Sequence, residues 1–154
     1  MTKPSRRRTR HAIALGVTAF AVLWTGQALA DPCEAPVAGF RAGQAFAGTV
    51  RYVGDGDSIC VGSAANPASW IEVRLADFYA PELREPGGEA ARSAMIGMAR
   101  GRSAQCTAVS GDHGRVVSYD RVIAVCRVGG VSLGDMMRRA AIREGGRGAV
   151  GGGR

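Results

Sequence analysis

Residues 46–77 read FAGTVRYVGDGDSICVGSAANPASWIEVRLAD, and this stretch decides the fold. Its apolar residues alternate with small or polar ones, as they do in strands that bury one face. Turn signals at Asp55-Gly56-Asp57 and at Asn66-Pro67 interrupt the alternation. We therefore predict three consecutive strands, over residues 46–53, 58–62 and 70–77.

Alternation also assigns faces within these strands. Val50 and Tyr52 fall on one side of the first strand. In the third strand, Glu72 and Arg74 point away from an apolar set that includes Val73. We expect the apolar sets to form the core.

The rest of the chain supplies two helices and two more strands. Residues 89–100 favour a helix with Ala90, Ala94, Met95 and Met98 on one face, and residues 132–142 favour a second helix capped by Ser132. Strands are expected over 104–110 and 119–128. The element order predicts an α+β, mainly β fold: a five-stranded Greek-key barrel of OB type with two packed helices.

Charge is concentrated at the two ends of the chain. The formal net charge is +7, but residues 1–30 carry Lys3 and four Arg without any acidic residue, and Arg147 and Arg154 lie near the other end. Residues 31–144 are formally neutral. This balance excludes a polybasic stripe that binds duplex DNA by bulk electrostatics.

The N-terminus is typical of an export signal. A basic segment, the uncharged run 12–26 and the small-residue pattern Ala28-Leu29-Ala30 predict a signal peptide over 1–30, cleaved after Ala30. The apolar run is too short for a bilayer span, so we expect a secreted or periplasmic protein with no membrane anchor after cleavage. The remaining units are an N-terminal extension (31–45), the folded domain (46–144) and a disordered Gly-rich tail (145–154), in a monomer.

Four cysteines follow the signal, and an even count in an exported chain indicates disulfides. Four cysteines allow three pairings, of which we favour Cys33–Cys60 and Cys106–Cys126. Alternation points Cys126 inward and Cys60 outward, where the extension that carries Cys33 can reach it. A zinc site is disfavoured because there is no Cys-x-x-Cys and His113 is the only His after residue 30.

Three local motifs carry the functional prediction: Asp55-Gly56-Asp57-Ser58, Arg74-Leu75 followed by Ala80-Pro81-Glu82, and Tyr119-Asp120-Arg121. Together, over roughly residues 46–142, they resemble the thermonuclease family of staphylococcal-nuclease-like domains. The resemblance implies an OB-type barrel that hydrolyses phosphodiester bonds of single-stranded DNA or RNA with Ca²⁺.

The chemistry of phosphodiester hydrolysis accounts for these residue types. Guanidinium groups neutralise the charge that builds on the phosphate, a carboxylate activates water, and a hard cation bound by carboxylates adds Lewis acidity. By resemblance, Arg74 and Arg121 are the clamp, Glu82 is the base, and Asp57 is a calcium ligand. Asp55 lies beside Asp57 as support or an extra ligand, and Tyr119 contacts the nucleotide.

The second arginine has a competitor in Arg115, within Asp112-His113-Gly114-Arg115. An apolar strand follows Arg121 directly, as the family pattern requires. After Arg115 the apolar run is interrupted at residues 118–120. We therefore assign the role to Arg121.

The chain departs from the family pattern at the metal site. Tyr79 stands where the family has a second metal carboxylate, and Ala80 offers only its backbone carbonyl. Asp77, two residues earlier, either directs its carboxylate toward the same site or pairs with a nearby Arg. Taken singly, the Asp-Gly turn and Glu82 also suit purely structural roles.

Two functions therefore remain open. The first is an exported, calcium-dependent nuclease with an altered set of metal ligands. The second is a catalytically weakened or inactive OB-fold module that binds nucleic acid or a protein partner in the cell envelope. We favour the enzyme, because a binding module has no need for the clamp and the base together.

Overall fold

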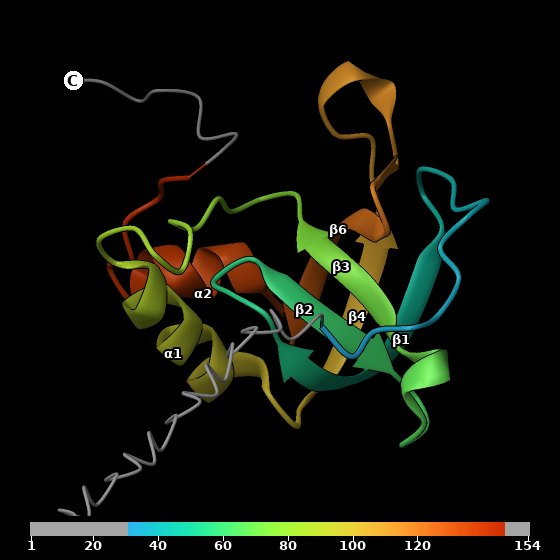
Figure 1. Ribbon diagram of the computed structural model, residues 1–154, viewed down its shortest axis with the longest axis horizontal. Coiled ribbons are helices and arrows are strands. Elements are labelled where there is room, and N and C mark those ends of the chain that lie inside the picture. Colours follow the sequence, from blue (N-terminus) through green and yellow to red (C-terminus); the bar gives the residue numbers. More distant parts are fainter. Residues whose placement is uncertain (1–30, 147–154) are drawn as a thin grey trace, which may run out of the picture.

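The computed structural model describes residues 31–146, so the predicted signal peptide and residues 147–154 of the predicted tail lie outside the described residues (Figure 1). In chain order the elements are β1 (Ala45–Val53), β2 (Ser58–Gly62), the 3₁₀ turn η1 (Pro67–Ser69), β3 (Ile71–Leu75), α1 (Gly88–Ala99), β4 (Ser103–Ala108), the 3₁₀ turn η2 (Asp112–Gly114), β5 (Val117–Ser118), β6 (Arg121–Val128), β7 (Val131–Ser132) and α2 (Leu133–Arg139).

Five of the strands close into a barrel. β1 pairs antiparallel with β2 and with β4, β2 pairs with β3, and β4 pairs with β6. The parallel pairing of β3 with β6 closes the ring. The short strands β5 and β7 pair with β6 outside it. The predicted mainly β, OB-type barrel with two helices is confirmed.

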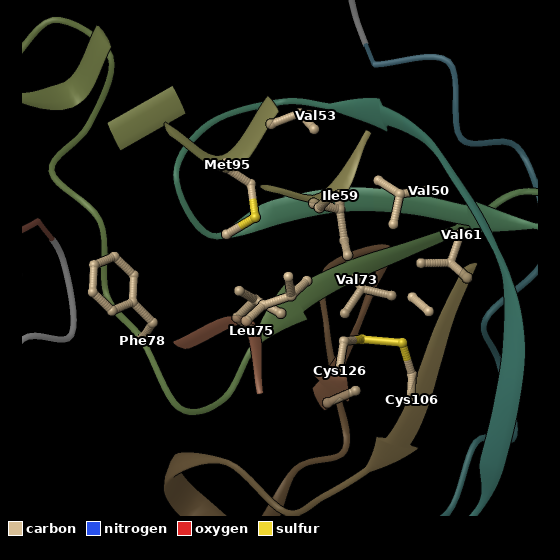
Figure 2. Close-up of a cluster of buried hydrophobic side chains, with 14 of the residues drawn as sticks. Val50, Val53, Ile59, Val61, Val73, Leu75, Phe78, Met95, Cys106 and Cys126 are labelled. Carbon is tan, nitrogen blue, oxygen red and sulfur yellow. A yellow bond between two sulfur atoms is a disulfide. The ribbon is translucent and has the colours of Figure 1, made fainter. Parts of the chain in front are cut away.

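The barrel interior is filled by buried apolar side chains (Figure 2). Its fully buried side chains come from every wall of the barrel and include Val50, Ile59 and Val73. The Cys106–Cys126 disulfide lies among them and joins residues that face each other on β4 and β6, with 4.1 Å between their Cα atoms. The predicted pairing and the inward direction of Cys126 are both confirmed.

The face assignment fails at the end of β1. A β-bulge lies between Val50 and Tyr52, so Val53 takes the inward position and Tyr52 is only half-buried. An extra residue on one strand reverses the alternation beyond it, which a strict period of two cannot anticipate.

Three of the four residues predicted to face inward on the first helix pack against the core. Ala91, Met95 and Ala99 face the core at intervals of four, whereas Ala90 is exposed. Alanine at most of these positions lets α1 approach the barrel closely.

The second helix is shorter than predicted, because it ends at Arg139. Its predicted cap is confirmed, since the Ser132 hydroxyl accepts a hydrogen bond from the Asp135 N–H. The two helices pack against each other at one end of the barrel (Figure 1). Neither helix, nor any other within residues 31–146, has the length and apolar character required to traverse a bilayer.

The N-terminal extension covers the outside of β2 and β3. The Cys33–Cys60 disulfide, also as predicted, fixes it there. Hydrogen bonds from the Glu34 N–H to the Pro67 carbonyl and from the Ala35 N–H to the Trp70 carbonyl continue the contact. Cys60 therefore points out of the barrel and is nevertheless fully buried.

The ordered body extends past the predicted boundary at residue 144. The Gly145 N–H donates a 2.9 Å hydrogen bond to the Tyr79 carbonyl. Gly146 has φ +75°, and a Cβ there would lie 2.4 Å from the Ala80 carbonyl oxygen. The start of the Gly-rich segment is therefore packed against residues 79–81, where only glycine allows this approach.

Candidate functional site

A single open cleft of about 900 Å³ gathers most of the predicted site residues. Its walls come from the β1–β2 turn, the end of β3 with the loop after it, the loop between β4 and β5, and the start of β6. The predicted residues that line it are Asp55, Asp57, Arg74, Tyr79, Ala80, Glu82, Tyr119 and Arg121. Residues separated by up to 66 positions in the sequence thus share one cavity.

The Asp55-Gly56-Asp57 turn is held by its own side chains. The Asp57 N–H donates a 2.9 Å hydrogen bond to Asp55 Oδ1, the geometry by which Asp stabilises a turn. The Asp57 carboxylate is 1% exposed, and its Oδ2 accepts a 2.6 Å hydrogen bond from the Ala80 N–H. Asp57 therefore fastens this turn to the segment that leads from β3 to Glu82.

Gly56 permits this arrangement by its lack of a side chain. A Cβ on Gly56 would lie 2.5 Å from the Ala80 Cβ and 2.7 Å from the Ala91 Cβ. Both distances are far below van der Waals contact, so the turn, the Ala80 segment and α1 fit together only around a glycine. Ala80 thus has a packing role that the sequence analysis missed.

Arg74 lines the cleft and interacts with two of the other lining residues. Its Nη1 forms an ion pair with Asp57 Oδ1, and its guanidinium carbon lies 5.3 Å from the centroid of the Tyr79 ring. Burial, and then repulsion by Arg121, lower the pKa of Arg74 from its ordinary value. Tyr79, which replaces an expected carboxylate, therefore provides an aromatic face for a partly desolvated guanidinium.

Arg121 enters the cleft from the first position of β6. Its Nε lies 4.0 Å from Glu72 Oε1, and its side chain is half-buried. The two guanidinium groups are close enough for each to affect the electrostatics of the site. Burial raises the pKa of the nearby Asp55 carboxyl, whereas Arg74 and Arg121 act to lower it.

Glu82 and Tyr119 provide the exposed groups of the cleft. Pro81 is buried and Glu82 exposed in the loop before α1, where the Glu82 N–H donates to Glu85 Oε2. Tyr119 is 93% exposed at the turn between β5 and β6. Its φ of 60° lies in the left-handed region, which non-glycine residues rarely occupy outside turns and functional sites.

The strand predicted over residues 119–128 is observed as β6, which begins two residues later, at Arg121. Tyr119 and Asp120 instead form the hairpin turn between β5 and β6. Arg115 lines the same cleft from the exposed loop after η2. Both candidate arginines therefore face the cavity, Arg121 from a strand and Arg115 from a loop.

Asp77 does not lie in the cleft. Its Oδ2 accepts a hydrogen bond from the Ser132 hydroxyl at the start of α2, and its backbone carbonyl accepts one from Arg138. β3 ends at Leu75, so the alternation on which the metal prediction for Asp77 was based stops before that residue. Asp77 links the end of β3 to α2 instead.

Glu72 was not singled out by sequence, although it faces the same side of β3 as Arg74. It is 7% exposed and contacts Arg121. The sequence did contain a feature that could have identified Glu72. It is a carboxylate two residues before the predicted clamp residue Arg74, on the same outward face of the strand.

The cleft offers few ligands for a cation. Ca²⁺ typically takes about six to eight oxygen ligands. Asp57 already interacts with Arg74 and the Ala80 N–H, Tyr79 supplies a phenol, and the Ala80 carbonyl lies against Gly146. These residues do not form a calcium cage made of protein oxygens alone.

Elsewhere between residues 31 and 146, one group has the spacing of metal ligands: Asp31, Cys33 and Cys60. Its two cysteines are joined in a disulfide, so neither is a thiolate ligand.

No family model matches this chain, and a search of the curated proteins returns no match either. Function must therefore be argued from the cleft itself.

Proposed function

We propose that this protein is an exported nuclease of the thermonuclease type, which hydrolyses phosphodiester bonds of single-stranded DNA or RNA in the cleft. One observation carries the proposal: Arg74 and Arg121 line the same open cavity as the exposed carboxylate of Glu82. A phosphodiester needs cationic donors for its non-bridging oxygens and a base for the attacking water, and this cavity contains both.

The electrostatics of the arginine pair favour an anionic ligand. Burial, and then repulsion from Arg121, disfavour the charged form of Arg74 and lower its pKa. A bound phosphate lying between the two groups would relieve that repulsion and accept charge-assisted hydrogen bonds from both. The cleft is also open to solvent.

The remaining side chains have roles that follow from their positions. Glu82 orients and deprotonates the attacking water, since its carboxylate is exposed at the rim of the cavity. Tyr79 supports the Arg74 guanidinium through the face of its ring. Tyr119 offers an exposed ring on which a base can stack.

We include a divalent cation, with Ca²⁺ as the first candidate, bound by Asp55 and Asp57 together with water and substrate oxygens. When bound, it would supply Lewis acidity and neutralise charge on the phosphate. Arg74 has to leave Asp57 for this to occur, and a bound phosphate gives Arg74 an alternative partner.

The two disulfides support export. One lies in the core and the other links the N-terminal extension to β2, and such bonds persist in oxidising compartments. We therefore propose a secreted or periplasmic location.

A specific observation favours the second function, a module that binds without cleaving: Asp57 is already ion-paired with Arg74 and hydrogen-bonded by the Ala80 N–H. Such a module would keep the arginines and have no use for Glu82 as a base. Replacing Glu82 therefore separates the two functions.

The test is cleavage of a fluorescently labelled single-stranded oligonucleotide by the wild type and by Glu82→Gln. Loss of a general base lowers turnover on the order of 100-fold or more. Glu89→Gln, an exposed acid in the first turn of α1 outside the cleft, is the matched control and should retain full activity. Equal turnover by Glu82→Gln and the wild type would contradict the assignment.

A further inference from the structure

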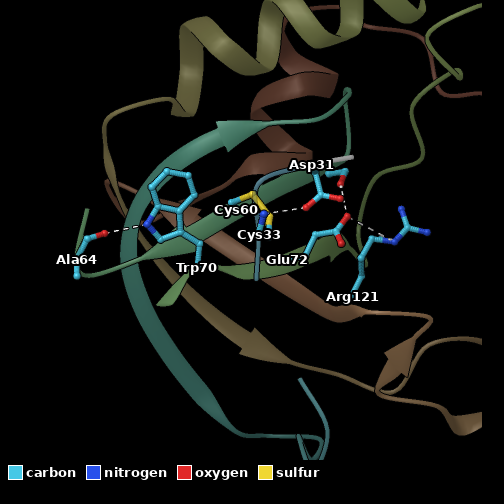
Figure 3. Close-up of a disulfide and its surroundings, with 8 residues drawn as sticks. Asp31, Cys33, Cys60, Ala64, Trp70, Glu72 and Arg121 are labelled. Atoms are coloured by element: carbon cyan, nitrogen blue, oxygen red, sulfur yellow. Dashed lines mark hydrogen bonds and ion pairs between the residues drawn. A yellow bond between two sulfur atoms is a disulfide. The ribbon is translucent and has the colours of Figure 1, made fainter. Parts of the chain in front are cut away.

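Glu72 is a buried carboxylate in an unusual position. It lies on β3 opposite Cys60 of β2, on the outside of the barrel, and is 7% exposed. The N-terminal extension, fastened by the Cys33–Cys60 disulfide, covers it (Figure 3). A buried carboxylate lowers the stability of the fold unless a cation or a hydrogen-bond donor is paired with it. Glu72 therefore needs such a partner.

The barrel register supplies that partner. Val73 of β3 lies beside Val122 of β6 in the parallel pair that closes the barrel, so the preceding residues, Glu72 and Arg121, are also neighbours. Glu72 Oε1 lies 4.0 Å from Arg121 Nε, and Figure 3 shows the two side chains approaching from adjacent strands. Ser58 of β2 holds the same oxygen from the other side, with its hydroxyl 3.4 Å away.

We propose that Glu72 is a positioning residue for Arg121: the charge of Glu72 attracts the guanidinium from its Nε side so that the other nitrogens face the cleft. The inference rests on the proposed function, because it takes Arg121 to be a phosphate ligand. Glu72 itself does not line the cleft and so acts only through Arg121. A guanidinium has five N–H donors. Its Nε side can therefore face a carboxylate while the Nη atoms donate hydrogen bonds to a phosphate.

The surroundings of Glu72 make this hold sensitive to pH. Burial, then Asp31 of the extension and Asp120 of the turn before β6, raise the pKa of Glu72 to about 7, against the opposing influence of Arg121 and Ser58. Asp31 is itself fixed by the Cys33 N–H, which donates a 2.9 Å hydrogen bond to its Oδ1. Above pH 7 Glu72 is ionised and holds Arg121; below pH 7 it takes up a proton and the ion pair is lost.

The functional test compares the steady-state cleavage of an oligonucleotide at pH 8 by the wild type and by Glu72→Gln. A misplaced clamp costs on the order of 10- to 100-fold in kcat, and KM should not rise, because the positive charge of Arg121 remains. The mutation should cause no further loss in an Arg121→Ala background. Glu34→Gln, which removes an exposed acid of the N-terminal extension that does not line the cleft, should leave kcat unchanged. A rise in KM with kcat unchanged, or additive effects in the double mutant, would overturn the proposal.

A measurement without substrate separates this inference from the proposed function. The ¹⁵N resonance of Arg121 Nε should shift with a midpoint near pH 7 in the wild type, as Glu72 titrates, and should show no such transition in Glu72→Gln. A flat resonance in an active wild-type protein would refute the positioning role. A clear transition in a protein that neither binds nor cleaves oligonucleotide would refute the proposed function and leave the Glu72–Arg121 contact standing.

Discussion

Replacing Glu72 by glutamine should stabilise the protein above neutral pH. The pKa of Glu72 is raised from 4.5 to about 7, which corresponds to a penalty of at most about 3.4 kcal/mol at high pH. Solvent screening at the edge of the extension reduces this, so we expect about 1 to 2 kcal/mol. Because the folded state binds the extra proton, this group lowers the free energy of unfolding as pH rises from 4.5 to 7.

The measurement is urea unfolding of the wild type and Glu72→Gln, with disulfides intact, at pH 4.5 and pH 8. The two proteins should have similar unfolding free energies at the lower pH, where Glu72 is protonated in the folded state and about half-protonated in the unfolded chain. The variant should be more stable at the higher pH. The control is Glu34→Gln, which replaces an exposed acid on the N-terminal extension that covers Glu72. This variant should show no such gain in unfolding free energy at the higher pH. A loss of stability for Glu72→Gln at pH 8 would refute the reasoning.

Three further predictions follow from the geometry. Gly56→Ala should lower the free energy of unfolding by about 1 to 3 kcal/mol, measured by urea titration, because the new Cβ would collide with Ala80; an unchanged midpoint would contradict this packing. Replacing both Cys106 and Cys126 by alanine should cost about 3 kcal/mol in the same assay, since their disulfide closes a loop of about 20 residues; a loss below 1 kcal/mol would be inconsistent. Tyr119→Ala should weaken binding of a single-stranded oligonucleotide about 5- to 100-fold by fluorescence anisotropy, with the unfolding midpoint unchanged; unaltered affinity would remove Tyr119 from the site.

The barrel and its disulfides were predictable because their signals are local. Alternation in the strands predicted the inward direction of Cys126 and the outward direction of Cys60, and both directions agree with the pairing that we favoured among the three possible ones. The Ser132 cap was equally local, since capping depends on a side chain and a backbone N–H three residues apart.

Several features that could not be predicted from the sequence lie where a regular strand is interrupted or ends. The bulge after Val50 reversed the faces of β1, and the end of β3 at Leu75 sent Asp77 to α2 rather than to the cleft. The turn at Tyr119 likewise delayed β6 until Arg121. Each of these features interrupts the alternation of inward and outward residues along a strand. The alternation itself does not indicate where it will be interrupted.

Glu72 was missed for a different reason. Its partner Arg121 comes from the parallel neighbour strand, and its burial comes from the disulfide-linked extension. Both are tertiary effects between residues far apart in the chain. A carboxylate kept at a cost in stability beside a candidate clamp residue is the pattern expected when function and stability compete.

The central claim, that the cleft cleaves a phosphodiester, is tested most directly by counting product molecules per protein molecule. The purified protein is mixed with excess single-stranded oligonucleotide in the presence of Ca²⁺, Mg²⁺ or Mn²⁺, with chelator as the control. We expect many cleavage products per protein molecule with at least one of these cations, and none with chelator. Saturable binding of an oligonucleotide that stays intact with every cation would contradict it and identify the protein as a binding module.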